Sequence, residues 1–231
     1  EEQLMKTAHA VKKAGATMLR GGAYKPRTSP YEFQGLGEDG LKMLAKAREE
    51  TNLPIVTELL SQDHADLVAE YADMLQIGTR NAQNFQLLIA AAKTGKPVLL
   101  KRGMSMRIME WLLAGEYVLA NRNPNLLFCE RGVRTFEDYT RNTLDLSAVA
   151  VVKNESHCPV VVDPSQGCGK SALVRTMCKG AVAMGADALL IEVHPDPAHA
   201  ISDAAQQIDL EGFADLMKEL GPIAESVGRE L

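Results

Sequence analysis

The sequence predicts an α/β fold, a (β/α)8 barrel that lacks its first strand, and two observations support this prediction. Seven short apolar runs, each ending in a charged or polar residue, alternate with stretches of helical periodicity along the chain. Continuous aliphatic runs are typical of parallel strands that helices cover. Strands that alternate with helices form either a doubly wound sheet or a closed barrel. Seven strands after a leading helix fit the barrel without its first strand.

The predicted strands share a β-branched or aliphatic centre followed by a polar end. They are residues 17–22, 54–59, 74–80, 97–103, 125–132, 159–165 and 188–194. In barrels of this kind the carboxyl ends of all strands lie on one face, and that face carries the active site. We therefore expect the charged residues at the strand ends to gather there.

The predicted helices lie before the first strand and between most of the others. They are residues 2–14, 63–71, 84–93, 108–120, 171–185 and 210–220. The first helix places Leu4, Ala8 and Val11 on one face, and Gly15 follows it as a C-cap. Gly95, Gly185 and Gly221 lie near the ends of three others. No helix is assigned in the two long connections that follow the first and the fifth strand.

The composition allows one large core and excludes several classes of protein. A chain of 231 residues with 46% hydrophobic content suits a single domain over residues 1–231, with no fused regulatory domain. The net charge of −5 argues against a nucleic-acid binder. No apolar stretch approaches the roughly 20 residues that a membrane helix needs, and the charged opening has no signal-peptide core. We expect a cytoplasmic protein with reduced thiols.

Six cations are expected to meet at the carboxyl ends of the strands and in the loop after the first strand. They are Arg20, Lys25, Arg27, Arg80, Lys101 and Arg131. Because like charges repel in a partly desolvated pocket, their convergence predicts a multiply phosphorylated ligand. Arginine binds phosphate and carboxylate through two parallel hydrogen bonds, and lysine also has a proton to donate. Two other interpretations stay open: a solvated basic turn around Lys25, and surface ion pairs in the connection after Arg131.

Several long blocks of the sequence resemble one enzyme family. They are LRGGAYKPRTSPYEFQGLGEDGL, LQIGTRNAQNF, PVLLKRGM, CERGVRTFEDYTRNTLDLSAV, VVDPSQ and IEVHPDP followed by SDAAQQI. These blocks, in this order over nearly the whole chain, resemble the type I 3-deoxy-D-arabino-heptulosonate 7-phosphate (DAHP) synthases, in the branch close to 3-deoxy-octulosonate 8-phosphate synthases. The resemblance implies a barrel that condenses phosphoenolpyruvate with erythrose 4-phosphate and releases phosphate, as the first step of the shikimate pathway.

The resemblance also implies a role for each cation. Arg20 and Lys101 match contacts to the carboxylate region of phosphoenolpyruvate, while Arg80, Lys101 and Arg131 match its phosphate clamp. Lys25 matches the residue that protonates the new alkoxide, which makes Lys25 and Lys101 the expected catalytic residues. Arg27 and Thr28 match the aldose phosphate site. Relatives form dimers and tetramers, so a homodimer or homotetramer is expected.

The metal site of the family is matched only in part. Family members hold a divalent metal, Mn²⁺ or a similar ion, with a cysteine, a histidine, a glutamate and an aspartate. Glu192 and Asp203 match the last two ligands, but Gln166 stands at the histidine position. An amide oxygen is a weaker ligand than an imidazole. The cysteine position has no counterpart, since the chain begins just after the place where that strand would end.

Three interpretations of Gln166 stay open. The site binds a metal more weakly, with Cys168 or His194 as added ligands; or it works without a metal; or the chain is a divergent or inactive relative that binds phosphoenolpyruvate without turnover. A 3-deoxy-octulosonate 8-phosphate synthase-like enzyme acting on arabinose 5-phosphate is a further alternative. The K-P-R-T motif favours the four-carbon sugar by resemblance.

Overall fold

A computed structural model describes all residues from 1 to 231 and contains one sheet of seven parallel strands. The strands follow one another in chain order around the sheet, and every pair of neighbours is parallel. They are β1 Leu19–Arg20, β2 Ile55–Glu58, β3 Met74–Ile77, β4 Val98–Lys101, β5 Leu126–Glu130, β6 Val160–Val162 and β7 Ala188–Leu189. Each lies within one of the seven predicted runs, so the predicted strand order is confirmed.

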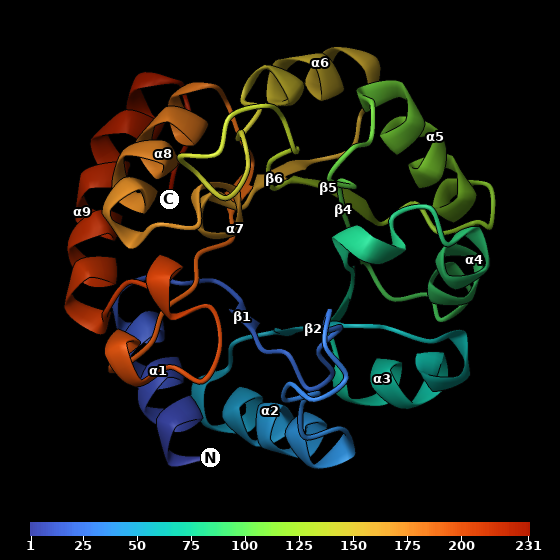
Figure 1. Cartoon of the computed structure of the whole chain (residues 1–231), viewed down its shortest axis with the longest axis horizontal. Helices are drawn as coiled ribbons and strands as arrows, with labels where there is room; N and C mark the ends of the chain where they lie inside the picture. The colour runs from blue at the N-terminus through green and yellow to red at the C-terminus, as the bar shows by residue number, and fades with distance from the viewer.

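The sheet curls into a ring that the helices surround, as Figure 1 shows. β1 and β7 form the two free edges, because they pair with β2 and β6 but not with each other. Helix α1 (Glu2–Lys13) packs beside the last helix, α9 (Leu210–Ser226), on the outside of this seam. The architecture is therefore the (β/α)8 barrel without its first strand.

The remaining helices include three that the sequence patterns did not reveal. The set is α2 Glu38–Thr51, α3 Ala65–Tyr71, α4 Phe85–Lys93, α5 Ile108–Leu119, α6 Ser147–Glu155, α7 Pro164–Cys168 and α8 Ser171–Ala183, with 3-10 turns at Gln62–His64, Thr79–Asn81, Pro197–His199 and Ala204–Gln206. α2 and α6 fall in the two connections where no helix was assigned, and α7 begins at Pro164, inside the run 159–165 that was predicted as a strand. α9 runs past its expected end, because Gly221 is accommodated within the helix and does not cap it.

The helices bury one apolar side against the outside of the sheet. The main core of 37 buried residues lies in this layer, and its largest fully buried side chains include Trp111 and Phe128. α2 contributes Leu41, Leu44 and Ala47, whose spacing of three residues keeps them on one face. No helix combines the length and the apolar character that crossing a membrane requires.

The interior of the barrel is built in two layers, because side chains alternate between the two sides of a strand. The lower layer is an apolar cluster: Val56, Met74, Leu99, Cys129, Val161 and Leu190. Two positions further along each of these strands the inward residue is polar, which gives Glu58, Gln76, Lys101, Arg131, Asp163 and Glu192. An apolar floor thus carries a polar layer at the carboxyl ends of the strands.

Candidate active site

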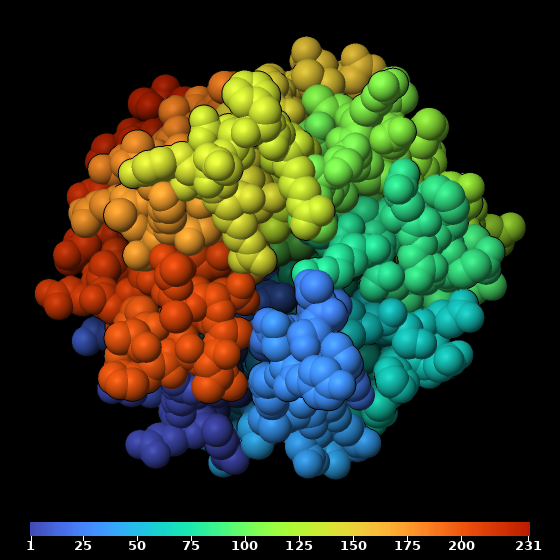
Figure 2. Space-filling model, in the orientation of Figure 1, coloured from blue at the N-terminus to red at the C-terminus, as the bar shows by residue number.

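The polar layer opens into a pocket of about 310 Å³ at the carboxyl ends of the strands. Ten of its lining residues are those that the sequence predicted for the site: Arg20, Lys25, Arg27, Thr28, Arg80, Lys101, Arg131, Gln166, Glu192 and Asp203. In Figure 2 the surface is hollowed near its centre, between the light-blue segment after β1 and the yellow segment after β5. Residues scattered over most of the sequence therefore meet in one place.

The pocket reverses the charge balance of the chain. Seven cations and four carboxylates line it, whereas the chain as a whole has a net charge of −5. A local positive excess in a partly desolvated pocket raises the local concentration of anions and attracts an anionic ligand. The solvated basic turn that the sequence left open does not describe Lys25, because this side chain faces the pocket and is half-buried.

Two cations of the pocket come from the strand ends and are buried. Lys101 is 5% exposed, and its Nζ lies 2.5 Å from Oδ2 of the fully buried Asp163. Arg131 is 4% exposed, yet it forms no ion pair and donates only to the carbonyl oxygen of Gly132, at 3.2 Å. A buried guanidinium without an anionic partner has a high desolvation cost. Arg131 is therefore the clearest sign that this pocket is built to bind an anion.

Arg20 stands between two carboxylates at the seam of the barrel. Its guanidinium nitrogens lie 3.6 Å from Glu58 and 3.9 Å from Glu192. Burial raises the pKa of Glu58, and the charge of Arg20 opposes that shift. Arg20 Nε and Gln76 Oε1 are buried without a hydrogen-bond partner. This part of the pocket therefore has one donor and one acceptor without a hydrogen-bond partner in the protein.

The loop between β1 and α2 carries the remaining predicted substrate contacts. Lys25 Nζ donates to Ser202 Oγ at 3.2 Å, and burial, reinforced by the charge of Arg20, lowers the pKa of Lys25. Arg80 Nη2 donates to Thr28 Oγ1 at 3.5 Å, which joins this loop to the turn after β3. The loop crosses itself at Gly35, where φ is +100° and a Cβ would stand 2.1 Å from a backbone oxygen.

The loop between β5 and α6 is held by a buried charge cluster. Arg102 Nη1 donates to Glu130 and to Asp145, at 2.9 Å in each case. Glu130 in turn accepts from the backbone N–H of Gly132 at 2.6 Å. Asp145 therefore anchors the loop that follows Arg131, and the surface ion-pair interpretation of this connection is wrong for Asp145.

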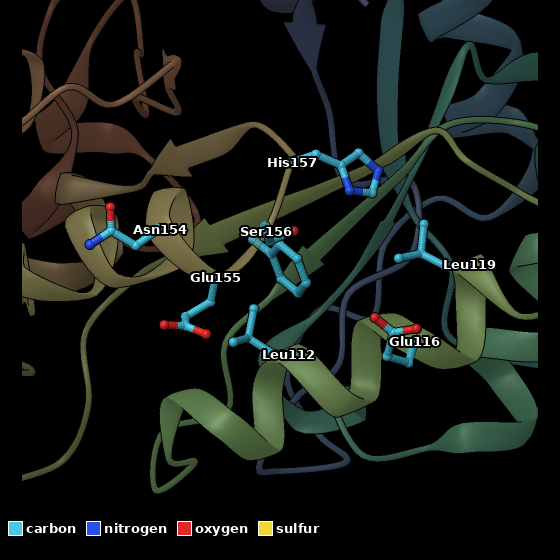
Figure 3. Close-up of a pocket in the computed structure, with 8 residues that line it drawn as sticks. Leu112, Glu116, Leu119, Asn154, Glu155, Ser156 and His157 are labelled. Atoms are coloured by element: carbon cyan, nitrogen blue, oxygen red, sulfur yellow. The ribbon is translucent and has the colours of Figure 1, made fainter.

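A second hollow, also of about 310 Å³, is lined mainly by residues of two outer helices. Figure 3 shows it between α5 and the end of α6, with Glu116, Glu155 and His157 among its lining residues. These residues precede β6 or lie on the outer helices, so they are remote from the carboxyl ends of the strands. The hollow contains none of the predicted site residues and no cation.

Comparisons with known proteins agree with this geometry. The model of the DAHP synthetase I family matches residues 1–226. This chain belongs to that family. It is 51% identical over 227 residues to the phospho-2-dehydro-3-deoxyheptonate aldolase of Thermotoga maritima, covering 98% of this chain and 67% of the relative. It is also 33% identical over 239 residues to a 2-dehydro-3-deoxyphosphooctonate aldolase of Caulobacter vibrioides, covering 95% and 82%.

Solved structures of the DAHP synthetase I family have the same fold. The crystal structure of the Thermotoga maritima DAHP synthase superposes with a TM-score of 0.96 at 50% identity, over 99% of this chain and 67% of that one. A truncated form of the enzyme from the same organism gives 0.92 at 46% identity, over 99% and 84%. The barrel seen here is therefore the barrel of this family.

The residues at the family's metal position do not fit a divalent ion. Both oxygens of Glu192 accept amide hydrogens, Oε1 from Gln166 at 3.0 Å and Oε2 from Gln206 at 2.8 Å. Asp203 accepts from Arg141 at 3.0 Å. No group of three or more histidine, cysteine, aspartate or glutamate side chains is arranged so that it could hold a metal ion. The metal expected from the family resemblance stays a prediction, and these contacts give it no support.

The two added ligands considered for a weaker metal site lie elsewhere. Cys168 is 3% exposed and outside the pocket lining, and burial raises the pKa of its thiol to about 11. His194 contacts the Gln3 side chain through Nε2 and accepts the backbone N–H of Asp196 at Nδ1. Both ring nitrogens are thus occupied away from the pocket.

Further polar residues join the site without having been predicted for it, among them Gln76, Arg141 and Gln206. Glu58 was expected at the strand ends with the other charged residues, and Gln76 could have been found in the same way, since it lies two positions after Met74 of the barrel floor. Arg141 and Gln206 are on long loops, where the sequence gives no period from which to place a side chain.

Proposed function

We propose that this chain is a DAHP synthase, which condenses phosphoenolpyruvate with erythrose 4-phosphate to give DAHP and inorganic phosphate. Buried Arg131, with no anionic partner, in a pocket that holds a positive excess, is the observation on which the proposal rests. The family membership and the 51% identical relative support the same reaction.

The assignment of the cations follows from their depth. Lys101 and Arg131 lie at the strand ends above the apolar floor, so they suit the smaller ligand, whose phosphate and carboxylate both need charge. Arg80 completes that phosphate clamp from the turn after β3, and Arg20 takes the carboxylate. Arg27 and Thr28 lie further out on the loop after β1, where the phosphate of the longer aldose would bind.

The reaction then needs two anions side by side. Carbon 3 of phosphoenolpyruvate attacks the aldehyde carbon, and the aldehyde oxygen takes the electron pair and a proton from Lys25 Nζ, which regains it from water. A water molecule adds at carbon 2 and releases the proton that returns to Lys25. The new hydroxyl then becomes the keto oxygen as the bond from carbon 2 to the phosphate oxygen breaks, and phosphate leaves with that bridging oxygen and the hydroxyl proton. The positive excess offsets the repulsion between the two substrates as they approach.

Release of phosphate from phosphoenolpyruvate, measured with erythrose 4-phosphate and with arabinose 5-phosphate, tests the proposal. We expect release with the four-carbon sugar and loss of most of it in Lys25→Met. Lys93→Met, which removes an exposed lysine on α4, is the matched control. Preference for arabinose 5-phosphate would indicate the 3-deoxy-octulosonate 8-phosphate reaction. Binding of phosphoenolpyruvate without release under any condition would indicate an inactive relative.

The wider setting of the proposal rests on the resemblance. A place at the entry of the shikimate pathway follows from the reaction itself. A homodimer or homotetramer and a cytoplasmic location stay predictions, and size-exclusion chromatography with light scattering measures the first of them.

A further inference from the structure

Glu192 is the centre of a closed hydrogen-bond network on the pocket wall. Each of its two carboxylate oxygens accepts an N–H, at 3.0 Å from Gln166 Nε2 and at 2.8 Å from Gln206 Nε2. The guanidinium of Arg20 lies 3.9 Å away and supplies positive charge. Each oxygen of the carboxylate thus already has one hydrogen-bond donor from the protein, and a positive charge lies nearby.

The orientation of the Gln206 amide is fixed by its other neighbour. Gln206 is 2% exposed, and its Oε1 accepts from Arg141 Nη1 at 2.8 Å. Turning the amide over would place Nε2 against the guanidinium and Oε1 against Glu192, which replaces two favourable contacts with two unfavourable ones. Gln206 therefore presents a donor to Glu192.

Gln166 is held at the other side of the carboxylate. Asp163 accepts its backbone N–H at 2.9 Å, and Asn142 Nδ2 donates to its backbone oxygen at 3.0 Å. The Gln166 side chain therefore starts from a fixed backbone and reaches Glu192 with its amide nitrogen. A neutral histidine at this position would offer a metal a nitrogen lone pair, whereas an amide nitrogen has none to offer.

The surroundings also disfavour an added cation. Arg20, Lys25 and Arg141 line the same wall, and Asp203 is engaged by Arg141 at 3.0 Å. A divalent ion at Glu192 would have to displace two amide donors and lie beside these three positive charges. Lys25, whose ammonium lies on this wall beside Ser202 at 3.2 Å, already supplies positive charge there.

We propose that the amides of Gln166 and Gln206 take the place of the divalent metal, and that the condensation proceeds in this chain without one. This inference rests on the proposed function and deepens it. In the step that forms the new carbon–carbon bond, Lys25 alone stabilises and protonates the aldehyde oxygen. Gln166 is a positioning residue that keeps Glu192 turned away from metal coordination.

Binding of Mn²⁺ to the purified protein, followed by electron paramagnetic resonance of the free ion, tests the inference independently of activity. The wild-type protein is first freed of metal by chelator and dialysis. We expect it to bind no stoichiometric Mn²⁺ at ion concentrations up to about 1 mM, so its dissociation constant for Mn²⁺ should exceed that concentration. Gln166→His should bind at least about tenfold more tightly, because it restores a nitrogen ligand. Adding Glu192→Gln to that variant should remove the gain.

Gln86→His is the matched control, because Gln86 is an exposed glutamine on α4 outside the pocket lining. It should bind Mn²⁺ no better than the wild-type protein does. One tightly bound Mn²⁺ per wild-type chain, lost on Glu192→Gln, would overturn the inference. So would a Gln166→His variant that folds normally, as judged by circular dichroism, and gains no affinity.

The rate of phosphate release provides the second measurement. We expect chelator to change the wild-type rate by no more than about twofold. Loss of a Lewis acid that contributes several kcal/mol to transition-state stabilisation would lower the rate far more. A large loss with chelator that Mn²⁺ restores would overturn the inference while supporting the proposed function. No release in any arm would instead refute the proposed function, and the Mn²⁺ measurement would still decide whether the amides exclude a metal.

Discussion

The cations of the pocket are held in two different ways, depending on whether they come from strands or from the loop after β1. Lys101 and Arg131 are at most 5% exposed, and Lys101 has a buried ion-pair partner at 2.5 Å. Lys25 and Arg27 are half-buried and rest on single hydrogen bonds, to Ser202 at 3.2 Å and to the Phe33 backbone oxygen at 3.0 Å. The strand half of the site, with Lys101 and Arg131, is therefore part of the buried core. The loop half, with Lys25 and Arg27, lies on the surface of that core.

This difference separates stability from catalysis. Lys101 cannot be removed without leaving the buried carboxylate of Asp163 unpaired, so its loss should damage both properties. A loop-held cation has no such partner, so its loss should damage the reaction alone.

The largest effect is expected from Lys101→Met. Phosphate release should fall by about a thousandfold or more, as when a preorganised charge at a reacting group is lost. Buried Asp163 loses its partner, so the free energy of unfolding should fall by roughly 3–5 kcal/mol. Urea denaturation measures the second effect.

The double variant Lys101→Met with Asp163→Asn is the control for this prediction. Because it removes both charges, it should regain most of the stability and none of the activity. A single variant as stable as the wild-type protein would show that the strand half is no more integral to the core than the loop half.

Lys25→Met should lower phosphate release by about 10²–10⁴-fold, the usual contribution of a positioned proton donor, with no loss of stability. The pH profile sharpens this prediction. Lys25 donates only when protonated, and burial lowers its pKa from the ordinary value of 10.5. The wild-type rate should therefore fall as the pH rises through a pKa below 10.5.

The lysine assignment has its own control. Lys25→Arg keeps the charge but has a guanidinium that stays protonated throughout this range. Any activity that this variant retains should not decrease as the pH rises through the pKa of Lys25. If the rates of both proteins fell at the same high pH, that fall would have to come from the titration of another group.

Arg27→Gln should have a smaller effect, confined to one substrate. We expect KM for erythrose 4-phosphate to rise by about 10- to 100-fold, in line with the loss of a charged hydrogen bond to phosphate. KM for phosphoenolpyruvate should change little, because Arg27 belongs to the outer half of the pocket. Equal increases for both substrates would contradict the division of the site into two halves.

The same division explains how much of the site the sequence reveals. The strand-held residues of the site can be predicted from the two-residue period of a strand. An apolar run shows which side chains point into the barrel, and the last inward side chain before the loop is the one at the site. Val56 and Glu58, or Leu99 and Lys101, illustrate this two-residue step. Lys25 and Arg27 were identified by resemblance and by the charge of their loop, not by any period.

Arg141 and Gln206 were missed because they lie on long loops, where no period places a side chain. The contact of Arg141 with Gln206 joins positions 65 residues apart, and nothing local in either segment encodes it. Helices α2 and α6 were missed for a related reason: α2 begins inside a connection whose glycines, prolines and charged residues were interpreted as loop, and α6 begins inside one interpreted from its charged residues. The hydrogen bonds that occupy Glu192 also needed coordinates, since Gln166 alone was compatible with weak metal binding, with metal-free catalysis and with inactivity.

Glu58→Gln should give the smallest effect, on stability and its pH dependence. Burial raises the pKa of Glu58 above its ordinary value of 4.5, so between these two pKa values the folded state binds more protons than the unfolded state. The wild-type free energy of unfolding should therefore fall as the pH rises from 4.5 through the folded pKa. The introduced amide would not titrate, but its oxygen would still accept the Gln76 amide hydrogen, whose nitrogen lies 3.3 Å from the Glu58 carboxylate. The variant should be more stable than the wild-type protein above that window and no more stable below it.

Urea denaturation of both proteins at several pH values from 4.5 to 8 measures this difference. The sign decides between two views of Glu58. If the wild-type protein gained stability relative to the variant as the pH rose, the attraction of Arg20, 3.6 Å away, would outweigh burial. Glu58 would then belong with Lys101 and Asp163 as a charge that the core requires. The expected fall instead marks Glu58 as a charge that the folded protein tolerates at a cost.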